Sequence, residues 1–450
     1  MTTPTDIHNI TPEEYDLVVI GSGEGSKFLA WTLARQGQRV AMIERKWIGG
    51  SCPNIACLPS KNIIHSAKVA SYFKRAAEFG INTPGYTVDI AAVTGRKRKM
   101  VKELVDIHVR NYEASGTELI LGRGHFIAPK LLEVDMSDGS KRYVTGTKIV
   151  IGTGTHATID NIPGLAAAKP LTHIEALEFE TLPDHLLILG GGYIGLEFAQ
   201  AMRRLGSKVS ILERNPTLLH REDPDVSAGI EGLFRDEGIE LLLNANVQEV
   251  SGLSCESVTV TYTENGGEKT INATHILVAT GRTPNTVGLG LELGGVAITD
   301  RGYIAVNDRL ETTAEGVWAN GEVAGQPQFT HIAFDDFRIL RDNFAGGNRT
   351  TTGRQVPYAL FTDPEVAHIG LSETQAKKQN IAYRLFKIPM AADLRTRTLS
   401  ETRGFMKALV AEDAASSASR SSASMAERSC PPFKSPCSVT CLSQRCVKRS

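Results

Sequence analysis

The fold follows from one stretch near the N-terminus, Asp16-Leu17-Val18-Val19-Ile20-Gly21-Ser22-Gly23-Glu24-Gly25-Ser26. The run up to Ile20 is apolar and rich in β-branched residues, which predicts a strand buried on both faces. A helical pattern then continues to Arg35, and residues 38–43 predict a second strand that ends at Glu44. Strand, glycine turn, helix and strand in this order indicate an α/β fold with a dinucleotide-binding unit.

Individual positions in this unit have physical reasons. Gly21 allows the tight turn, and Gly23 lets backbone amides approach a pyrophosphate at the positive end of the helix. Glu44, at the tip of the second strand, can accept hydrogen bonds from an adenosine ribose. The third glycine position holds Ser26, which we expect to loosen helix–strand packing slightly. We predict that this unit binds a cofactor and is more than a structural turn.

The same unit recurs between His185 and Arg214. The two copies align without a gap when 169 is added to each residue number, so that Gly21 matches Gly190 and Glu44 matches Glu213. Two copies predict two nucleotide cofactors in one chain. The candidate residues of the second site are Gly190, Gly192, Tyr193, Gly195 and Glu213.

Two of the seven cysteines, Cys52 and Cys57, lie just beyond the first unit. One turn of helix with an irregular start can bring residues at this spacing within the ~7 Å Cα separation that a disulfide needs. A sulfur near a helix N-terminus forms a thiolate more easily, so we expect the pKa of Cys52 to lie below that of a free cysteine. The alternatives are a zinc site, for which two ligands are too few, and two coincidental buried thiols.

These motifs resemble those of the flavin-dependent pyridine nucleotide–disulfide oxidoreductases, which include lipoamide dehydrogenases, glutathione reductases and mercuric reductases. The resemblance extends from about Tyr15 to about Asp413. It implies two Rossmann-like domains, one for FAD and one for NAD(P), followed by a truncated α+β dimerisation domain. The expected domains are residues 1–155 and 283–352 for FAD, 156–282 for NAD(P), and 353–413 for partial dimerisation.

Further segments match the family in the expected order. Two strand-Thr-Gly passages, one ending at Thr153-Gly154 and one at Gly281-Arg282, mark the crossings between the FAD and NAD domains in relatives. The segment Gly316–Glu322 resembles the second FAD fingerprint. The acidic residue of that fingerprint, usually Asp, binds the ribityl chain, and here it is Glu322.

The resemblance also implies roles in electron transfer. Hydride would pass from NAD(P)H to FAD, and two electrons would then reduce the Cys52–Cys57 disulfide. Cys57 would face the flavin and Cys52 would attack the substrate, a disulfide or a metal ion. Lys61 would point at the flavin N5 region, with Glu197 as its partner and as a candidate nicotinamide contact. Tyr193 would be the gate through which the nicotinamide enters.

The donor is predicted from Glu213, the acidic residue of the second unit. Its carboxylate accepts from a free ribose 2′-hydroxyl and repels a 2′-phosphate, so NADH is favoured over NADPH. Arg214 adjoins Glu213 and softens this preference.

Composition limits the partners. The chain has 450 residues, which suggests roughly three domains, and a net charge of −1, which gives no electrostatic reason to bind nucleic acid or an anionic membrane. No apolar segment approaches the ~20 residues of a membrane span, and the N-terminus lacks the layout of a signal peptide. We therefore expect a cytoplasmic protein without a metal site, and by resemblance a homodimer.

The last segment, residues 414–450, changes character. It is of low complexity and then rich in cysteine, without helical or strand periodicity, so we expect an aberrant, disordered tail. A disordered linker with a metal-binding end is one alternative. The hypothesis that we favour is a shifted reading frame. Dropping one nucleotide from one choice of codons turns part of the segment into an amphipathic helix like that of the family's dimerisation domain.

That hypothesis has a chemical consequence. Family members end with a His-Pro-x-x-x-Glu segment whose His–Glu pair serves the partner subunit's dithiol as acid and base. None of the 11 histidines lies beyond His368. Three functions stay open: an NADH-dependent flavoprotein disulfide reductase, which is favoured but impaired; a diaphorase-type NADH dehydrogenase that reduces quinones, oxygen or metals; and an inactive product of an interrupted gene.

Overall fold

The computed structural model describes residues 10–411 and 420–422, which divide into two units. Unit 1 contains the described residues up to Asn62, together with Thr94–Thr158 and Gly281–Arg354. Unit 2 contains Ile63–Val93, Ile159–Thr280 and the described residues from Gln355 onward. The sequence assigns residues 63–93 to the FAD domain, whereas in the structure their apolar side chains share a core with unit 2. The other predicted domain borders stay predictions.

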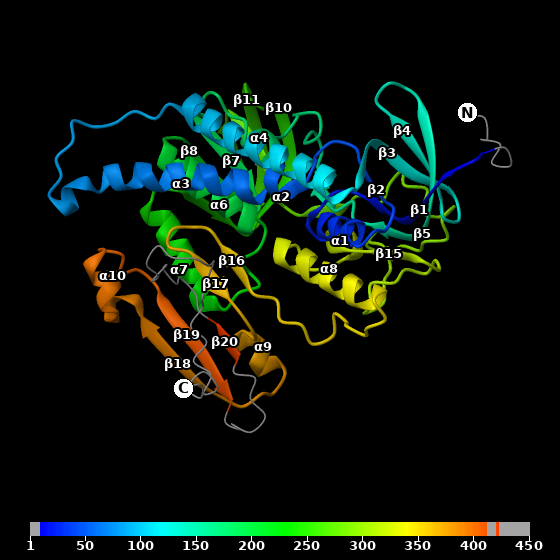
Figure 1. The fold of residues 1–450 in the computed structure, drawn as a ribbon. Coiled ribbons are helices and arrows are strands. Elements are labelled where there is room, and N and C mark those ends of the chain that lie inside the picture. Colours follow the sequence, from blue (N-terminus) through cyan, green and yellow to red (C-terminus); the bar gives the residue numbers. More distant parts are fainter. Residues whose placement is uncertain (1–9, 412–419, 423–450) are drawn as a thin grey trace. The chain divides into compact units, whose positions relative to one another are not determined.

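Unit 1 is built on a mixed sheet, whose strands are blue to cyan in Figure 1 apart from β15. Strands β3, β2, β1, β5 and β15 are parallel in this spatial order, and β4 joins β3 to β5 antiparallel, so the pairing returns to β1. The strands are β1 (Glu13–Ile20), β2 (Val40–Glu44), β3 (Glu118–Ala128), β4 (Leu131–Met136), β5 (Lys141–Ile151) and β15 (Val317–Ala319), with the separate antiparallel pair β6 (Thr155–Ala157) and β14 (Arg282–Pro284).

Of the helices of unit 1, the sequence predicts the one after the first strand and the helical turn at the cysteine pair. The helices of this unit are α1 (Glu24–Arg35), α2 (Ser51–Asn54), the start of α3 (Cys57–Lys74), most of α4 (Ile90–Ser115), the short helix Gly321–Ala324 and α8 (Thr330–Phe344).

Strand β1 is buried on both faces, as predicted. Leu17 and Val19 belong to one apolar core with residues of α1 and α8, and Val18 and Ile20 belong to another with residues of β3 and β4. Successive side chains of a strand point to opposite faces, so β1 contributes to both cores. This burial fixes the end of β1, and therefore the glycine turn that follows it.

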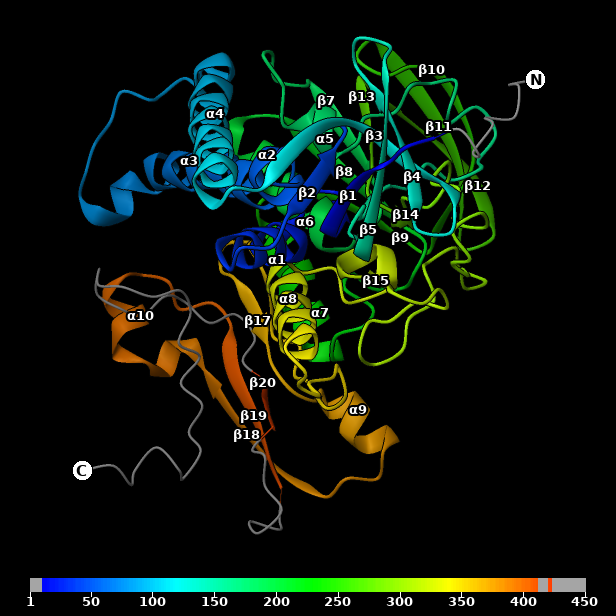
Figure 2. The same cartoon turned by 45° about the vertical axis from the view of Figure 1, so that its right-hand side comes forward.

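Unit 2 repeats the strand–glycine–helix plan on a four-stranded parallel sheet of order β13-β7-β8-β9. An antiparallel sheet β10-β11-β12 follows, and the C-terminal strands β18, β19 and β20 lie side by side in Figure 2. The strands are β7 (His185–Leu189), β8 (Lys208–Glu213), β9 (Glu240–Leu243), β10 (Ala245–Leu253), β11 (Ser257–Glu264), β12 (Gly267–Ala273), β13 (His275–Val278), β16 (Tyr358–Leu360), β17 (Val366–His368), β18 (Tyr383–Pro389), β19 (Phe405–Ala411) and β20 (Arg420–Ser422).

The helices of unit 2 include the rest of α3. The others are Ala76–Phe79, α5 (His173–Ala176), α6 (Tyr193–Leu205), α7 (Pro224–Asp236), α9 (Glu373–Lys378), Met390–Ala392 and α10 (Leu394–Thr398). None of the described helices in either unit combines the length and the apolar composition that crossing a membrane requires.

Strand β20 lies inside the segment 414–450 that we expected to be disordered. It pairs antiparallel with β19, with Ser421 opposite Ala408. The rest of that segment, including its four cysteines and the proposed frame shift, lies outside the described residues.

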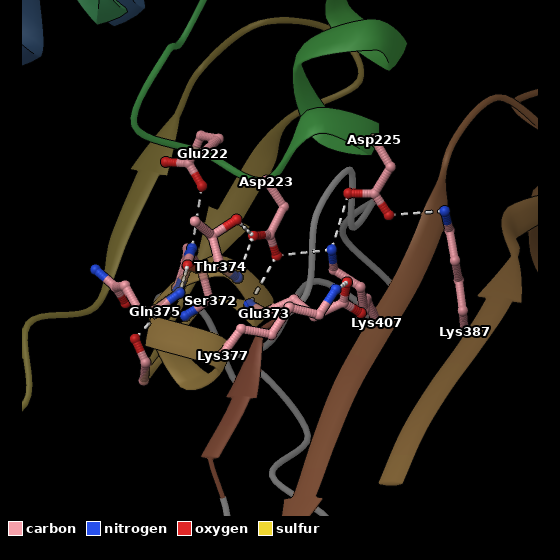
Figure 3. Close-up of polar contacts among 12 residues, drawn as sticks. Glu222, Asp223, Asp225, Ser372, Glu373, Thr374, Gln375, Lys377, Lys387 and Lys407 are labelled. Carbon is pink, nitrogen blue, oxygen red and sulfur yellow. Dashed lines mark hydrogen bonds and ion pairs between the residues drawn. The ribbon is translucent and has the colours of Figure 1, made fainter. Parts of the chain in front are cut away.

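A buried ion network joins the C-terminal sheet to α7 (Figure 3). The Asp223 carboxylate accepts hydrogen bonds from the backbone N–H groups of Glu373 and Thr374, both at 2.9 Å, and from Lys407 Nζ at 2.8 Å. Lys407 also bonds Asp225 Oδ1 at 2.8 Å and is 3% exposed. Burial opposes the charge of Asp223, but the Lys407 and Thr374 hydrogen bonds outweigh it and hold the pKa of Asp223 well below its usual range.

We predict that Lys407→Met destabilises the protein by about 3–5 kcal/mol, because it leaves the Asp223 carboxylate buried without its cation. Urea unfolding at neutral pH measures this loss. Because the folded-state pKa of Asp223 is lowered, its contribution is present above the unfolded carboxyl pKa of ~3.9 and is lost as the pH falls through the folded value.

The matched control is Lys377→Met, which removes an exposed lysine that pairs with Glu373 within α9. We expect no measurable loss, since water screens this pair. Equal losses for the two variants would show that burial of Lys407 does not matter.

Candidate active site

The two strand–glycine–helix turns have the same geometry. Gly21 has φ +94°, and a Cβ there would lie 2.5 Å from Gly152 O, directly after β5. Gly190 has φ +106°, and its Cβ would lie 2.6 Å from Ala279 O. An L-residue with a side chain is therefore excluded from both turns, by backbone conformation and by contact.

After each of these turns, the N-terminus of the following helix leaves room for a phosphate. Helices α1 and α6 are preceded by Gly23 and Gly192, which make no side-chain cap, so the first backbone N–H groups can bind an anion. A Cβ at Gly192 would meet nothing within 4 Å, and one at Gly23 would meet its nearest neighbour at 3.6 Å. Near α1, Asn320 Nδ2 is buried and has no hydrogen-bond partner among the described residues. These features fit the pyrophosphate of a dinucleotide such as FAD.

Ser26, at the third motif position of unit 1, is tightly packed. It is 1% exposed, and its hydroxyl donates to Asn320 Oδ1 at 3.1 Å. A Cβ on Gly152 would lie 2.0 Å from Ser26 Oγ, so the glycine on β5's end makes room for the serine. The expected loosening is therefore wrong. In unit 2 the equivalent Gly195 instead lies against Gly190 O.

Glu44 at the tip of β2 holds the first glycine turn. Its Oε2 accepts from Ser22 N at 2.9 Å and Ser22 Oγ at 2.7 Å, and its Oε1 accepts from Lys46 N and Trp47 N at 2.8 and 3.0 Å. These bonds use the roughly four acceptor sites of a carboxylate. Its contact with a ribose stays a prediction, and it requires one of these bonds to be exchanged.

Glu213 at the tip of β8 makes the same bond to the second turn. Its Oε2 accepts from Gly191 N at 2.7 Å, and its Oε1 accepts from Asn215 N at 2.7 Å and Asn215 Nδ2 at 2.5 Å. Three bonds leave capacity for one more donor, such as a ribose hydroxyl.

The cysteine pair lies against the start of α1. Cys52 is the second residue of α2 and Cys57 the first of α3, and both are half-buried thiols. Gly50, with φ +82°, brings this segment so close that a Cβ there would lie 2.6 Å from Gly23 Cα. Cys57 Sγ lies 3.2 Å from Thr330 Oγ1, at the start of α8. The thiols and the first phosphate-binding turn therefore form one site in unit 1.

The pKa of Cys52 is raised, which contradicts the expected effect of the helix N-terminus. The largest cause is the hydrogen bond with Cys57, followed by burial, and the Glu24 carboxylate adds to them. Helix α2 has four residues, too short for a strong dipole. The proton of Cys52 is therefore held by the contact with the Cys57 sulfur and by burial.

The two predicted domain crossings come together in unit 1. Asn285 Nδ2 donates to Thr153 O at 2.7 Å, and Arg282 Nε donates to Glu322 Oε2 at 3.1 Å. Thr155 Oγ1 contacts the same Glu322 oxygen. The predicted residues gathered here are Thr153, Gly154, Gly281, Arg282 and Glu322.

Lys61 and Glu197 belong to different units, and each is described within its own. Lys61 is half-buried on α3, one turn beyond Cys57. Glu197 is buried on α6, and its Oε1 accepts from the backbone N–H of Phe361 at 3.0 Å. Their predicted pairing stays a prediction.

The sequence analysis missed several residues of the sites. Thr330 contacts Cys57 across 273 positions of sequence. Glu222, Tyr358 and His368 form a buried network with Tyr193. Polar residues at these places carry no motif, so the sequence offers no local signal for them.

One described group offers three possible metal ligands. Atoms of His125, Glu133 and Asp135, on β3 and β4, lie within 4.8 Å of one another. Lys141 Nζ lies 2.5 Å from Glu133 Oε1 and already supplies the positive charge. We therefore assign no metal to this group.

Comparisons with known proteins agree with this geometry. Residues 15–336 match the family model described as pyridine nucleotide-disulphide oxidoreductase, and residues 356–416 match its dimerisation domain. The chain is 37% identical to the probable pyridine nucleotide-disulfide oxidoreductase RclA of Escherichia coli strain K12, covering 88% of this chain and 86% of RclA. It is 36% identical to a mercuric reductase of Streptomyces lividans, covering 88% and 84%. The Cu(II) complex of the flavoprotein disulfide reductase RclA from E. coli superposes with a TM-score of 0.81 at 36% identity, covering 89% and 87%.

We predict that Gly192→Ala weakens nucleotide binding at α6 at least about tenfold, or ~1.4 kcal/mol, while the fold stays intact. The added methyl meets open space in the protein but lies where a pyrophosphate approaches. Calorimetric titration with NAD⁺ measures the affinity, and circular dichroism checks the fold.

Gly232→Ala on α7 is the matched control, because a Cβ there also meets nothing within 4 Å. It should bind NAD⁺ as the unmodified protein does. An unchanged affinity of Gly192→Ala would place the nucleotide elsewhere.

Proposed function

The chain belongs to the pyridine nucleotide-disulphide oxidoreductases, and on this basis we propose that it uses NADH to reduce the Cys52–Cys57 disulfide and passes the electrons to a disulfide or metal-ion acceptor. As a member of this enzyme family it binds FAD and a pyridine nucleotide. The thiol pair, on the segment that Gly50 packs against the start of α1, is the observation that carries the proposal.

FAD, when bound, supplies two-electron transfer between a nicotinamide and a disulfide. The residues that would hold it are those of unit 1: the helix start at Gly23, the Asn320 amide, and the group around Thr153, Arg282 and Glu322. The pyridine nucleotide would be held at the start of α6, with Tyr193, Glu197 and Glu213 nearby in sequence or structure.

The two sulfurs have different roles in this proposal. NADH and one proton reduce the disulfide to two thiols, and the dithiol then reduces an acceptor disulfide by thiol–disulfide exchange and closes again. The raised pKa of Cys52 keeps its proton in place, and by family resemblance Cys57 is the sulfur that faces the flavin. Cys52 then attacks the acceptor once Cys57 or a base has taken its proton.

We predict that anaerobic NADH titration of the protein consumes two reducing equivalents beyond those that the flavin takes, because a disulfide is a two-electron acceptor. In Cys57→Ser, reduction by NADH should stop once the flavin is reduced, because no disulfide can form. The control is Cys255→Ser, which removes an exposed thiol and should titrate like the unmodified protein. If the unmodified protein also stops at the flavin, the pair is idle and the chain is a diaphorase-type NADH dehydrogenase.

The preference for NADH rests on Glu213. Its carboxylate keeps capacity for a ribose 2′-hydroxyl, and its negative charge repels a 2′-phosphate. Arg214 adjoins it and reduces this repulsion.

We predict that kcat/KM for flavin reduction is at least about tenfold higher with NADH than with NADPH, or ~1.4 kcal/mol. Glu213→Gln should reduce the ratio of kcat/KM with NADH to kcat/KM with NADPH, because it removes the repulsive charge at nearly constant side-chain shape. Glu256→Gln, at an exposed turn of unit 2, should leave the ratio unchanged. A higher value with NADPH would overturn the assignment of the donor.

The acceptor is proposed by class. Two adjacent thiols are soft ligands that suit thiophilic metal ions as well as disulfides. A relative is described as a mercuric reductase, and the solved structure of RclA is described as a Cu(II) complex. Both support a metal ion as a possible substrate, and a reducing compartment such as the cytoplasm would keep the thiols in use.

A homodimer is part of the proposal. On one face of strand β18, Phe386 and Ile388 are each about half exposed, and Met406 on β19 lies opposite Ile388. An apolar sheet face in a matched dimerisation domain supports burial against a second copy.

A further inference from the structure

Three side chains of unit 2 converge on one buried carboxylate. Glu222, just before α7, is 8% exposed. Its Oε1 accepts from Tyr358 OH at 2.6 Å and from Tyr193 OH at 3.2 Å, and its Oε2 lies 3.1 Å from His368 Nδ1. Tyr358 and His368 are direct partners across β16 and β17, with their rings stacked at 5.0 Å. The network therefore joins α6, α7 and the strand pair.

The partners of His368 determine where its protons are. His368 Nε2 lies 3.1 Å from Gly370 O, a carbonyl that can only accept, so Nε2 carries a hydrogen. Nδ1 faces Glu222 Oε2, which when ionised can also only accept, and as long as Tyr358 OH donates its hydrogen to Glu222 Oε1, Nδ1 carries a hydrogen too. Burial opposes the ionisation of Glu222, but hydrogen bonds from His368 and Tyr358 outweigh it, and the pKa of Glu222 is lowered. The geometry is that of an imidazolium–carboxylate pair.

Loss of the pair's proton changes the network. A neutral His368 keeps its hydrogen on Nε2 and presents a lone pair to Glu222 Oε2 at 3.1 Å, which is repulsive. Tyr358 OH lies 2.9 Å from His368 Nδ1 and can turn its hydrogen to the ring, releasing Glu222 Oε1. Of the donors named here, Tyr193 alone then holds the carboxylate. Protonation of the pair therefore decides how Tyr193 is held.

Tyr193 lies where a nucleotide would bind. It is the first residue of α6 and follows Gly192, where a Cβ would meet open space. We propose that the Glu222–His368 pair positions Tyr193 and links pyridine-nucleotide binding to the uptake of a proton. This inference rests on the proposed function, because it requires a nucleotide at the start of α6.

The sign of the linkage follows from the hydrogen bonds. A nucleotide that displaces Tyr193 removes one donor from Glu222, which makes the carboxylate more basic. The pair then holds its proton more tightly, so nucleotide binding is accompanied by proton uptake. Nucleotide affinity therefore rises as the pH falls, by up to about tenfold per pH unit if one full proton is linked.

The other titratable groups that face Tyr193 do not account for such a proton. The pKa of Tyr193 and that of Tyr358 are both raised above the usual value of a tyrosine. The larger cause is burial, and the negative charge of Glu222 adds to it. Arg221 acts on Tyr193 electrostatically, but a guanidinium stays charged near neutral pH. Glu222 and His368 are therefore the groups to test.

The test is calorimetric titration of the FAD-bound full chain with NAD⁺ at several pH values between about pH 5 and 8. Two buffers with different ionisation enthalpies give the number of protons taken up. The unmodified protein should take up a fraction of a proton that depends on pH. His368→Gln and Glu222→Gln should take up none, and their affinity should no longer follow pH.

Tyr193→Phe keeps the pair and deletes one hydroxyl, so it tests the link even if the other variants fold poorly. It too should lose proton uptake. His275→Gln, a half-buried histidine at β13 of the same unit, is the matched control and should take up protons like the unmodified protein.

Two results would overturn the inference, and they are distinguishable. If His368→Gln or Tyr193→Phe takes up as many protons as the unmodified protein, the linkage is wrong and the proposed function is unaffected. Failure of the unmodified protein to bind NAD⁺ would overturn the proposed function and the linkage together.

Discussion

The contact between a glycine and the carbonyl that directly follows a neighbouring strand is the constraint on which both units depend. A side chain at Gly21 or Gly190 would collide with the backbone of Gly152 or Ala279, which is held in place by the buried strand just before it. The contact places the following helix start over the end of the sheet. In each unit an acidic residue from the next strand, Glu44 or Glu213, then bonds the backbone N–H just after the glycine. Turn, helix start and acid are therefore fixed as one rigid group.

Much of the fold could be predicted because its determinants are local. The run Asp16–Ile20, the glycines and the helical pattern after them each constrain their own neighbourhood, and their repetition 169 residues later gave the second unit. The family resemblance supplied the remaining order of domains. The packing of residues 63–93 within unit 2 was not predictable in this way, because an apolar pattern predicts that a helix face is buried but not against which core it packs.

The candidate sites were predicted less completely, because their chemistry depends on contacts between distant residues. Thr330 reaches Cys57, and Gly152 makes room for Ser26, through tertiary packing that no local pattern encodes. The expected acidity of Cys52 failed for a related reason. A neighbouring sulfur in hydrogen-bond contact influences a thiol more than one turn of helix does. The pKa of Cys52 therefore depends on how close the fold brings Cys57 to it.

Strands β16 and β17 have three residues each, and they place Tyr358 opposite His368. Side chains alternate between the two faces of a strand, so a slip of one residue would turn either ring to the other face. Backbone pairing could survive such a slip, but the rings would no longer stack on each other and both bond Glu222. The length of the connection Phe361–Glu365 is therefore under a constraint of its own. Among descendants of this chain, substitutions in that connection would be tolerated far more readily than insertions or deletions.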